Sequence, residues 1–187
     1  GGALLLTVSR GSWVGLGCAV LTVAVLRYRK LLPLIALGLV LVLVLPWTQG
    51  YVQHFVEGLQ VADLSTQMRM GEYKDTLILI GRYPVFGVGF AGAPDIDIYV
   101  AVANVYLLIA AQMGLVGLAV FLIVVGVLLA RFWRYRTLAH SLLQVEPLWY
   151  GMHAAVIGGL IGGVFDHYFF SLDFHHSVTL FWLVVGL

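Results

Sequence analysis

The stretch Gln67–Phe90, QMRMGEYKDTLILIGRYPVFGVGF, is the most polar run in an otherwise apolar chain. It contains Arg69 and Arg82. Pro84 and the glycine-rich run that follows it end any helix that contains these two arginines. Long hydrophobic runs flank the loop to which the stretch belongs. We expect this loop to carry the chemistry of the protein, and the flanking helices to hold it at a membrane surface.

The composition is typical of an integral membrane protein. Of the 187 residues, 61% are hydrophobic and 10% are charged, and the mean hydropathy is +1.01. A soluble domain would have about a quarter of its residues charged, so the charge here is too small to cover a water-exposed surface. The single cysteine, Cys18, cannot form an internal disulfide, and we interpret it as a packing residue.

The predicted fold class is all-α, a polytopic bundle of transmembrane helices with one large, partly helical extracytoplasmic loop. The expected spans of this single membrane domain, 1–187, are residues 11–26, 31–47, 105–130, 148–165 and 174–187, and the loop is 48–102. The first two spans are near the lower length limit for crossing a hydrocarbon core of about 30 Å. Since residue 1 is not Met, we expect the chain to be the C-terminal part of a larger polytopic protein.

Local patterns add detail to this prediction. Residues 57–80 of the loop can form a helix, although their periodicity is weak. In the fourth span the pairs Gly158-Gly159 and Gly162-Gly163 stand one turn apart, a spacing that lets two helices approach closely. Ser9 is placed to cap a helix that begins near Arg10.

The basic residues predict the orientation of the spans. Six of the ten lie in two clusters that crossing parity puts on one face, and the positive-inside rule makes that face cytoplasmic. The clusters are Arg27, Arg29 and Lys30, and Arg131, Arg134 and Arg136. The same parity puts Arg10, the loop 48–102 and the connection Asp166–His176 on the extracytoplasmic face, where eight of the nine acids also fall.

An arginine on the extracytoplasmic face works against the insertion bias and needs a reason. One reason is an anion, because a guanidinium binds phosphate oxygens and a lipid-linked pyrophosphate lies at headgroup depth. The alternative is ordinary ion pairing of Arg69 and Arg82 with nearby acids. On one straight helix these two side chains would differ by about 140° in azimuth and about 20 Å in height. A single pyrophosphate could then not contact both, so either Gly71 or Gly81 breaks the helix or the two arginines do different jobs.

Three more polar residues on this face are candidates. Arg10, at the mouth of the first span, is either an anion ligand or a snorkelling anchor. Asp166 and His167 lie at the outer end of the fourth span, where a histidine beside a carboxylate can act as a general base on a sugar hydroxyl. They are otherwise ordinary interfacial residues of a short turn. The spacing fits no standard metal site, so we expect no metal or other cofactor, and nothing in the sequence indicates nucleic-acid binding.

The chain resembles the C-terminal half of the bacterial O-antigen ligase and polymerase superfamily. Each stretch that carries the resemblance is weak alone, but the order and spacing of the set are specific. There are four such stretches: Thr7–Gly11; the loop run from Arg69 to Phe90, which ends in Arg82–Phe90; Asn104–Leu107 followed by Gln112–Leu118; and Leu180–Leu187.

The resemblance implies a metal-independent glycosyltransferase of the bacterial inner membrane that makes lipopolysaccharide or another envelope polysaccharide. Its donor would be a polyprenyl-diphosphate-linked glycan, and its acceptor a lipid or glycan hydroxyl. Carried over by position, Arg10, Arg69 and Arg82 would bind the pyrophosphate. Ligases of the family have His-Asn where this chain has Ala103-Asn104, which favours a polymerase-like or divergent member in which Asp166 or His167 replaces the base. An anion (bicarbonate-like) transporter and a non-catalytic scaffold of a polysaccharide assembly complex are the alternatives.

Overall fold

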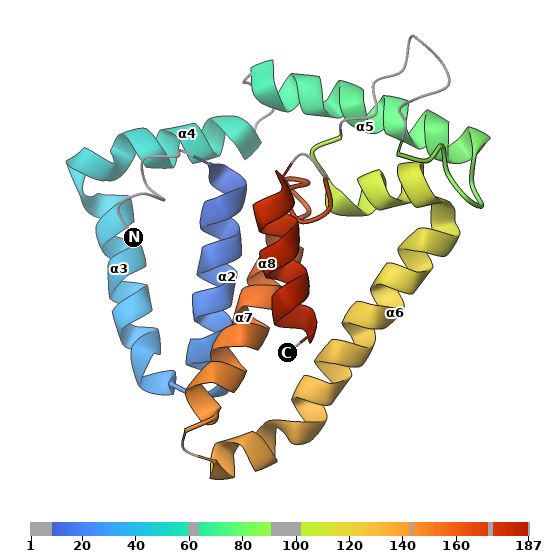
Figure 1. Ribbon diagram of the computed structural model, residues 1–187. Helices are drawn as coiled ribbons and strands as arrows, with labels where there is room; N and C mark the ends of the chain where they lie inside the picture. The colour runs from blue at the N-terminus through green and yellow to red at the C-terminus, as the bar shows by residue number, and fades with distance from the viewer. Residues whose placement is uncertain (1–8, 60–63, 91–101, 143, 172–173, 187) are drawn as a thin grey trace.

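The computed structural model describes residues 9–59, 64–90, 102–142, 144–171 and 174–186, and this part of the chain is helical without a strand (Figure 1). The all-α prediction is thereby confirmed. Thr7 and Val8 of the first family-like stretch, and Leu187 of the last, lie outside the described residues. The helices are α2 Arg10–Leu26, α3 Leu32–Val44, α4 Gln49–Leu59, α5 Leu64–Arg82, α6 Val105–Ser141, α7 Glu146–Gly162 and α8 His175–Gly186, with 3-10 turns at Arg29–Leu31 and Pro46–Thr48.

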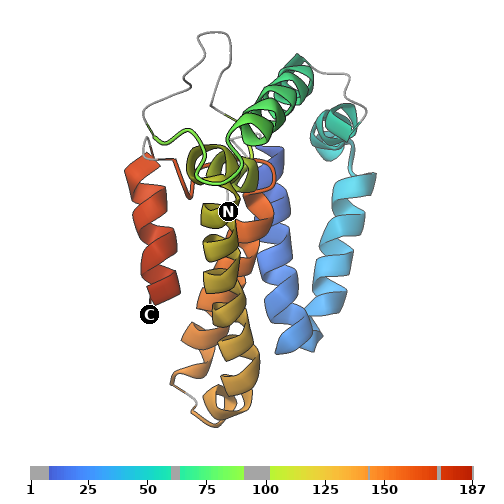
Figure 2. The same ribbon diagram turned by 90° about the vertical axis from the view of Figure 1, so that its right-hand side faces the viewer.

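The helices form an upright group with two helices lying across one end. Figures 1 and 2 show α2, α3, α7, α8 and most of α6 running roughly parallel to one axis, while α4 and α5 lie across their upper end. The chain turns by 81° between α3 and α4. Consequently the loop in which the sequence predicts the chemistry forms a layer over one end of the upright helices.

Two antiparallel helices, α2 and α7, pack closely because glycines face each other. A Cβ atom on Gly158 would lie 2.6 Å from the carbonyl oxygen of Gly15, and one on Gly15 would lie 2.8 Å from that of Gly158. The expectation that the glycines of the fourth span allow close helix approach is therefore confirmed. At its start, α2 is capped as predicted, since the Ser9 hydroxyl accepts a hydrogen bond from the Ser12 N–H.

Helix α6 is broken near its start, and the glycine-rich run of the loop fills the break. Gly114 has φ 70° and ψ −176°, which interrupts the helix. The N–H groups of Val88 and Gly89 donate to the carbonyls of Ala111 and Gln112, both at 2.8 Å, and the N–H of Leu115 donates to the Pro84 carbonyl at 2.8 Å. Backbone groups left without an intrahelical partner by the break are thus satisfied by the loop.

Beyond the break, α6 runs through the second basic cluster to Ser141, eleven residues past the end of the apolar run at Ala130. No proline or glycine interrupts residues 127–146, so the helix continues although the apolar run has ended. Within this extension the Arg136 guanidinium lies 3.7 Å above the ring centroid of Trp133, a cation–π contact between residues three apart on a helix.

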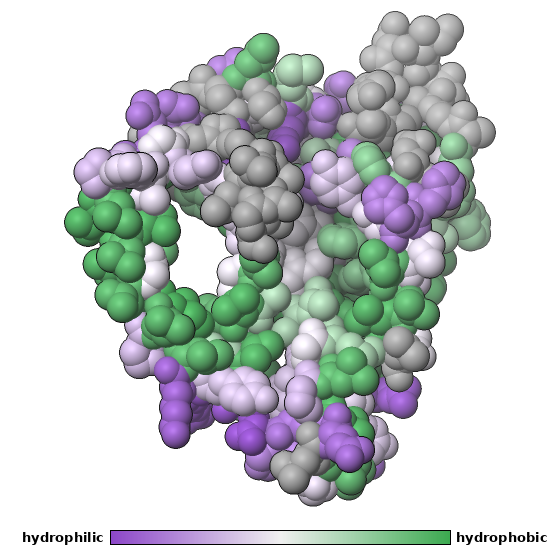
Figure 3. Space-filling model, turned by 60° about the vertical axis from the view of Figure 1, so that its left-hand side comes forward, coloured by the Kyte–Doolittle hydropathy of each residue, from purple (hydrophilic) through white to green (hydrophobic). Residues whose placement is uncertain are grey.

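The core is small and lies where α6, α7 and α8 meet. Its buried members are Val105, Ile109, Phe121, Val125, Val156 and Phe181. Elsewhere large apolar side chains are exposed, and α3 has no buried residue at all. Figure 3 shows these apolar side chains as a band between hydrophilic side chains at the two ends of the molecule. Such a surface is unusual for a soluble monomer.

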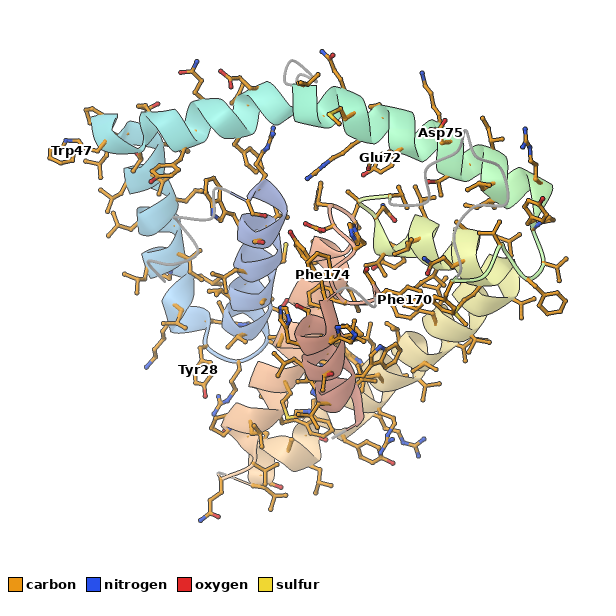
Figure 4. The ribbon with its side chains drawn as sticks, turned by 45° about the horizontal axis from the view of Figure 1, so that its top comes forward. Tyr28, Trp47, Glu72, Asp75, Phe170 and Phe174 are labelled. Atoms are coloured by element: carbon orange, nitrogen blue, oxygen red, sulfur yellow. The ribbon has the colours of Figure 1, made fainter. Side chains whose placement is uncertain are left out.

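Helix α6 has the length and hydropathy needed to cross a membrane. Among the described residues it is the one helix that meets both requirements by itself. The bent pair α3–α4 would be a second candidate if the pair counted as a single span. Aromatic side chains stand at opposite ends of the apolar band, with Trp47 92% exposed at the α3–α4 bend and Tyr28 after α2 (Figure 4). Tyrosine and tryptophan are enriched at membrane–water interfaces, and these two positions fit such a belt.

Candidate functional site

A cavity of about 380 Å³ lies beneath α5, at the end of the molecule that α4 and α5 cover. Five segments that are distant in the sequence contribute to its wall, and we call it the arginine cavity. Its lining residues are Arg10, Gly11, Val14, Phe55, Thr66, Arg69, Met70, Tyr73, Asn104, Val164 and Phe165. Two of the three arginines predicted to bind pyrophosphate therefore line one cavity.

The two arginines reach the cavity from different helices. Arg10 is the first residue of α2, directly after the Ser9 cap. Arg69 is in α5 together with Thr66 and Tyr73, and spacings of three and four residues put these side chains on one face of the helix. Both guanidinium-bearing residues are partly buried. An anion in the cavity would thus meet two positive charges at reduced exposure to water.

Tyr73 and Asn104 give the cavity two polar groups beyond the residues predicted to form the site. Burial raises the pKa of the Tyr73 hydroxyl, against a smaller opposing effect of Arg69, so this group stays protonated at neutral pH. The Asn104 side chain caps α6 by accepting from the Leu107 N–H at 3.0 Å, and its Nδ2 donates to the Val164 carbonyl at 2.9 Å. Asn104 therefore ties the start of α6 to the end of α7. The spacing of Tyr73 from Arg69 was the signal that could have identified it.

The segment just before Asn104 is held by α5. The Ala103 N–H donates to Glu72 Oε2 at 3.3 Å, and the Tyr73 hydroxyl donates to the Ala103 carbonyl at 3.4 Å. Figure 4 shows Glu72 on the side of α5 that faces the start of α6. Ala103, where the resemblance leads us to expect a histidine, is thus fixed through its main chain, and a carboxylate lies beside it.

Asp166 lies close to the arginine cavity. It lines a neighbouring cavity of about 280 Å³ between α2 and α7, and Gly11 is common to the walls of both. The negative charge of Asp166, followed by burial, raises the pKa of the Tyr168 hydroxyl, and Arg69 acts on the same hydroxyl in the opposite sense. The Asp166 carboxylate and the Arg69 guanidinium therefore share one electrostatic environment.

His167 contacts Asp166 and lines neither cavity. Its main-chain N–H donates to Asp166 Oδ1 at 2.8 Å, and its ring Nδ1 lies 3.6 Å from the same oxygen. His167 is absent from the walls of both cavities. Among the described residues no group of three His, Cys, Asp or Glu side chains is arranged to hold a metal ion.

Arg82 is separated from the other two arginines. Helix α5 is continuous from Leu64 to Arg82, and neither Gly71 nor Gly81 breaks it. Arg82, its last residue, does not line the arginine cavity. Arg82 is thirteen positions after Arg69 on the unbroken helix, about 20 Å along the axis. Of the two arrangements that the sequence left open, the structure has the unbroken helix, on which Arg69 and Arg82 are too far apart to contact one pyrophosphate.

Residues 1–122 match the model of a protein family described as O-antigen ligase. The chain belongs to the O-antigen ligase family. The match includes Arg10, Arg69 and Arg82 and confirms the resemblance seen in the sequence, while the stretch 180–187 lies beyond it. O-antigen ligases are membrane proteins and act on lipid-linked glycans. Neither the curated proteins nor the solved structures give a significant match to the chain.

Proposed function

We propose that this O-antigen ligase family member is a glycosyltransferase that moves a glycan from a polyprenyl-diphosphate carrier onto an acceptor hydroxyl. The reaction would take place at the outer face of the bacterial inner membrane, in the synthesis of lipopolysaccharide or another envelope polysaccharide. One observation carries the proposal. Arg10 of α2 and Arg69 of α5, 59 positions apart in the sequence, line the same cavity.

The proposed topology has the upright helices as spans and α4 and α5 as the extracytoplasmic layer. Three observations support it. The apolar band lies between two hydrophilic ends (Figure 3). Both basic clusters lie at one end, because Arg27 after α2 pairs with Glu146 at the start of α7, next to the end of α6. The arginine cavity lies at the other end, under α5.

The proposed chemistry uses the two arginines for the leaving group. The acceptor oxygen attacks the anomeric carbon of the donor sugar, and the bond from that carbon to the diphosphate oxygen breaks. Arg10 and Arg69 stabilise the negative charge that develops on the departing polyprenyl diphosphate, which is an electrostatic contribution realised in the transition state. The acceptor proton passes to the Asp166 carboxylate, with His167 beside it as the second predicted group for this step.

A transporter has less support in this arrangement. Residues 11–26, 31–47 and 105–130 contain no charged side chain, and membrane transport of an anion generally needs polar groups within the spans. The two arginines that line the arginine cavity lie at one end of the upright helices instead, Arg10 at the start of α2 and Arg69 in α5.

The test is glycan transfer in proteoliposomes that contain the full-length protein and a polyprenyl-diphosphate-linked glycan. We expect Arg69→Ala to reduce transfer on the order of 100-fold, the usual cost of removing one donor that stabilises a transition-state charge. Arg69→Lys should be only partly active, because lysine keeps the charge but loses the two-pronged geometry. Lys74→Ala is the matched control, since Lys74 is an exposed cation of the same helix that does not line the cavity.

Thermal unfolding in detergent shows whether each variant is folded. The proposal is overturned if Arg10→Ala and Arg69→Ala are both folded and both transfer glycan at the wild-type rate. Equal losses in Lys74→Ala and Arg69→Ala would also contradict it, because a general effect of positive charge would then account for the result.

A further inference from the structure

A second cavity lined by cations lies at the opposite end of the molecule. It measures about 320 Å³ and lies where α2 ends, α6 ends and α7 begins. We call it the basic cavity, and its lining residues are Leu26, Arg27, Arg136, Thr137, His140 and Tyr150. The proposed glycan transfer uses none of them. The site has two guanidinium groups, an imidazole and two hydroxyls around one space, with an apolar side chain at its edge.

The carboxylate nearest to the basic cavity is already engaged. Glu146 is 4% exposed, and Arg27 binds both of its oxygens, through Nε to Oε1 and through Nη2 to Oε2 at 3.3 Å. His140 Nδ1 lies 2.6 Å from Oε1. Glu146 does not line the cavity. It therefore offsets one positive charge of the group without occupying the space that a ligand would take.

Positive charge remains in excess around the cavity. Arg136 lines it, and the guanidinium is oriented by stacking on Trp133. Arg29, Lys30, Arg131 and Arg134 belong to the same two clusters, whereas Glu146 is the one acid that the sequence contains between Asp97 and Asp166. A ligand of complementary charge is an anion, and guanidinium and hydroxyl donors suit phosphate oxygens.

We propose that the basic cavity binds the phosphate of an anionic phospholipid headgroup. The location favours a lipid over a free anion, because the apolar residue Leu26 lines the cavity beside its cations. Exposed apolar side chains precede the cavity on both helices, such as Val25 on α2 and Val127 on α6, so acyl chains could continue along them. Basic pockets between helices on the cytoplasmic side are known sites for anionic lipid headgroups. The bound lipid would join α2, α6 and α7 at one point.

The test is lipid titration of the purified full-length protein by native mass spectrometry. Phosphatidylglycerol is the anionic probe, and phosphatidylcholine of the same chain length is the zwitterionic comparison. We expect phosphatidylglycerol to bind more tightly, and Arg136→Gln to weaken it about fivefold, the effect of one basic side chain at an anionic membrane surface. Arg134→Gln is the matched control. It removes the same charge two residues before Arg136, and the Arg134 side chain does not line the cavity.

A milder variant and a competitor complete the design. Thr137→Val removes one hydroxyl donor with little change of shape and should also weaken phosphatidylglycerol binding. Equal affinities for the two lipids, or equal losses in Arg136→Gln and Arg134→Gln, would overturn the proposal. Displacement of phosphatidylglycerol by millimolar inorganic phosphate would overturn the lipid assignment, because the cavity would then be a site for free phosphate.

Discussion

Gly87 and Gly114 pack backbone against backbone where the glycine-rich run of the loop contacts the break in α6. A Cβ atom on Gly87 would lie 2.6 Å from the backbone nitrogen of Gly114, and one on Gly114 would lie 2.6 Å from that of Phe86. Both glycines have positive φ, 68° and 70°. Two of the family-like stretches, 82–90 and 112–118, are therefore the two halves of one backbone junction, which fixes the end of α5 on α6.

The first prediction concerns this junction. Gly114→Ala should lower the free energy of unfolding by about 1–3 kcal/mol, because its backbone conformation is one that residues with a Cβ rarely adopt and the added methyl would meet the loop. Gly126→Ala is the control, since a Cβ at this position of the same helix meets nothing within 4 Å; it should be neutral or slightly stabilising. Unfolding in detergent measures both, and equal effects would contradict the prediction.

The second prediction compares the two arginines of α5. Because Arg82 is outside the arginine cavity, Arg82→Ala should retain clearly more glycan transfer than Arg69→Ala, and Arg69→Ala should account for most of the loss in the double variant. Initial rates at several donor concentrations give kcat and KM for each variant. If Arg82→Ala proved as damaging as Arg69→Ala in a folded protein, the assignment of the pyrophosphate to this cavity would be wrong.

The third prediction concerns the contact between α2 and α7. Gly158→Ala should destabilise the protein by about 1–3 kcal/mol, typical of overpacking, since the added Cβ would meet the Gly15 carbonyl and the Ala19 side chain. It should also reduce transfer, because the two helices that would be pushed apart are α2, which begins at Arg10, and α7, which ends four residues before Asp166. Gly151→Ala, in the same helix with no atom within 4 Å of an added Cβ, is the matched substitution and should leave stability and transfer near wild type.

The fourth prediction uses the pKa of Tyr168. The Asp166 charge is the largest cause that raises this pKa, because a nearby carboxylate disfavours a second negative charge. Removing the charge with Asp166→Asn should therefore shift the Tyr168 titration to lower pH. Difference absorbance of the phenolate, recorded against a Tyr168→Phe variant, follows this one group. An unchanged titration would show that Asp166 and Tyr168 are not in contact.

The fifth prediction concerns the ion pair at the basic end. Arg27→Gln and Glu146→Gln should each lower the melting temperature, because each leaves a partner without its counter-charge. The double variant should be less destabilised than the sum of the two single variants, as expected for residues in direct contact. Melting curves of the four proteins test this, and strictly additive effects would argue against the pair.

The sequence by itself determined the helical class, the close packing of glycines in the fourth span, the Ser9 cap and the family. These features are written in local patterns, such as apolar runs, glycine spacing and a hydroxyl before a helix, and such patterns act through the nearest turns of the chain. The sequence also showed that Arg69 and Arg82 could not share one ligand on a straight helix. It could not show whether the helix was straight.

Only the tertiary structure decided which polar residues meet. Arg10 and Arg69 line one cavity because α4 and α5 together lie across the upper end of the upright helices, where α2 begins. Asp166 lies beside this cavity because α7 runs antiparallel to α2. The break at Gly114 exists because the loop 84–89 supplies hydrogen-bond partners for it. These relationships depend on packing and hydrogen bonds between segments that are distant in the chain. Residue spacing fixes the periodicity of each helix, but the helices around a site are brought together by contacts that spacing does not specify.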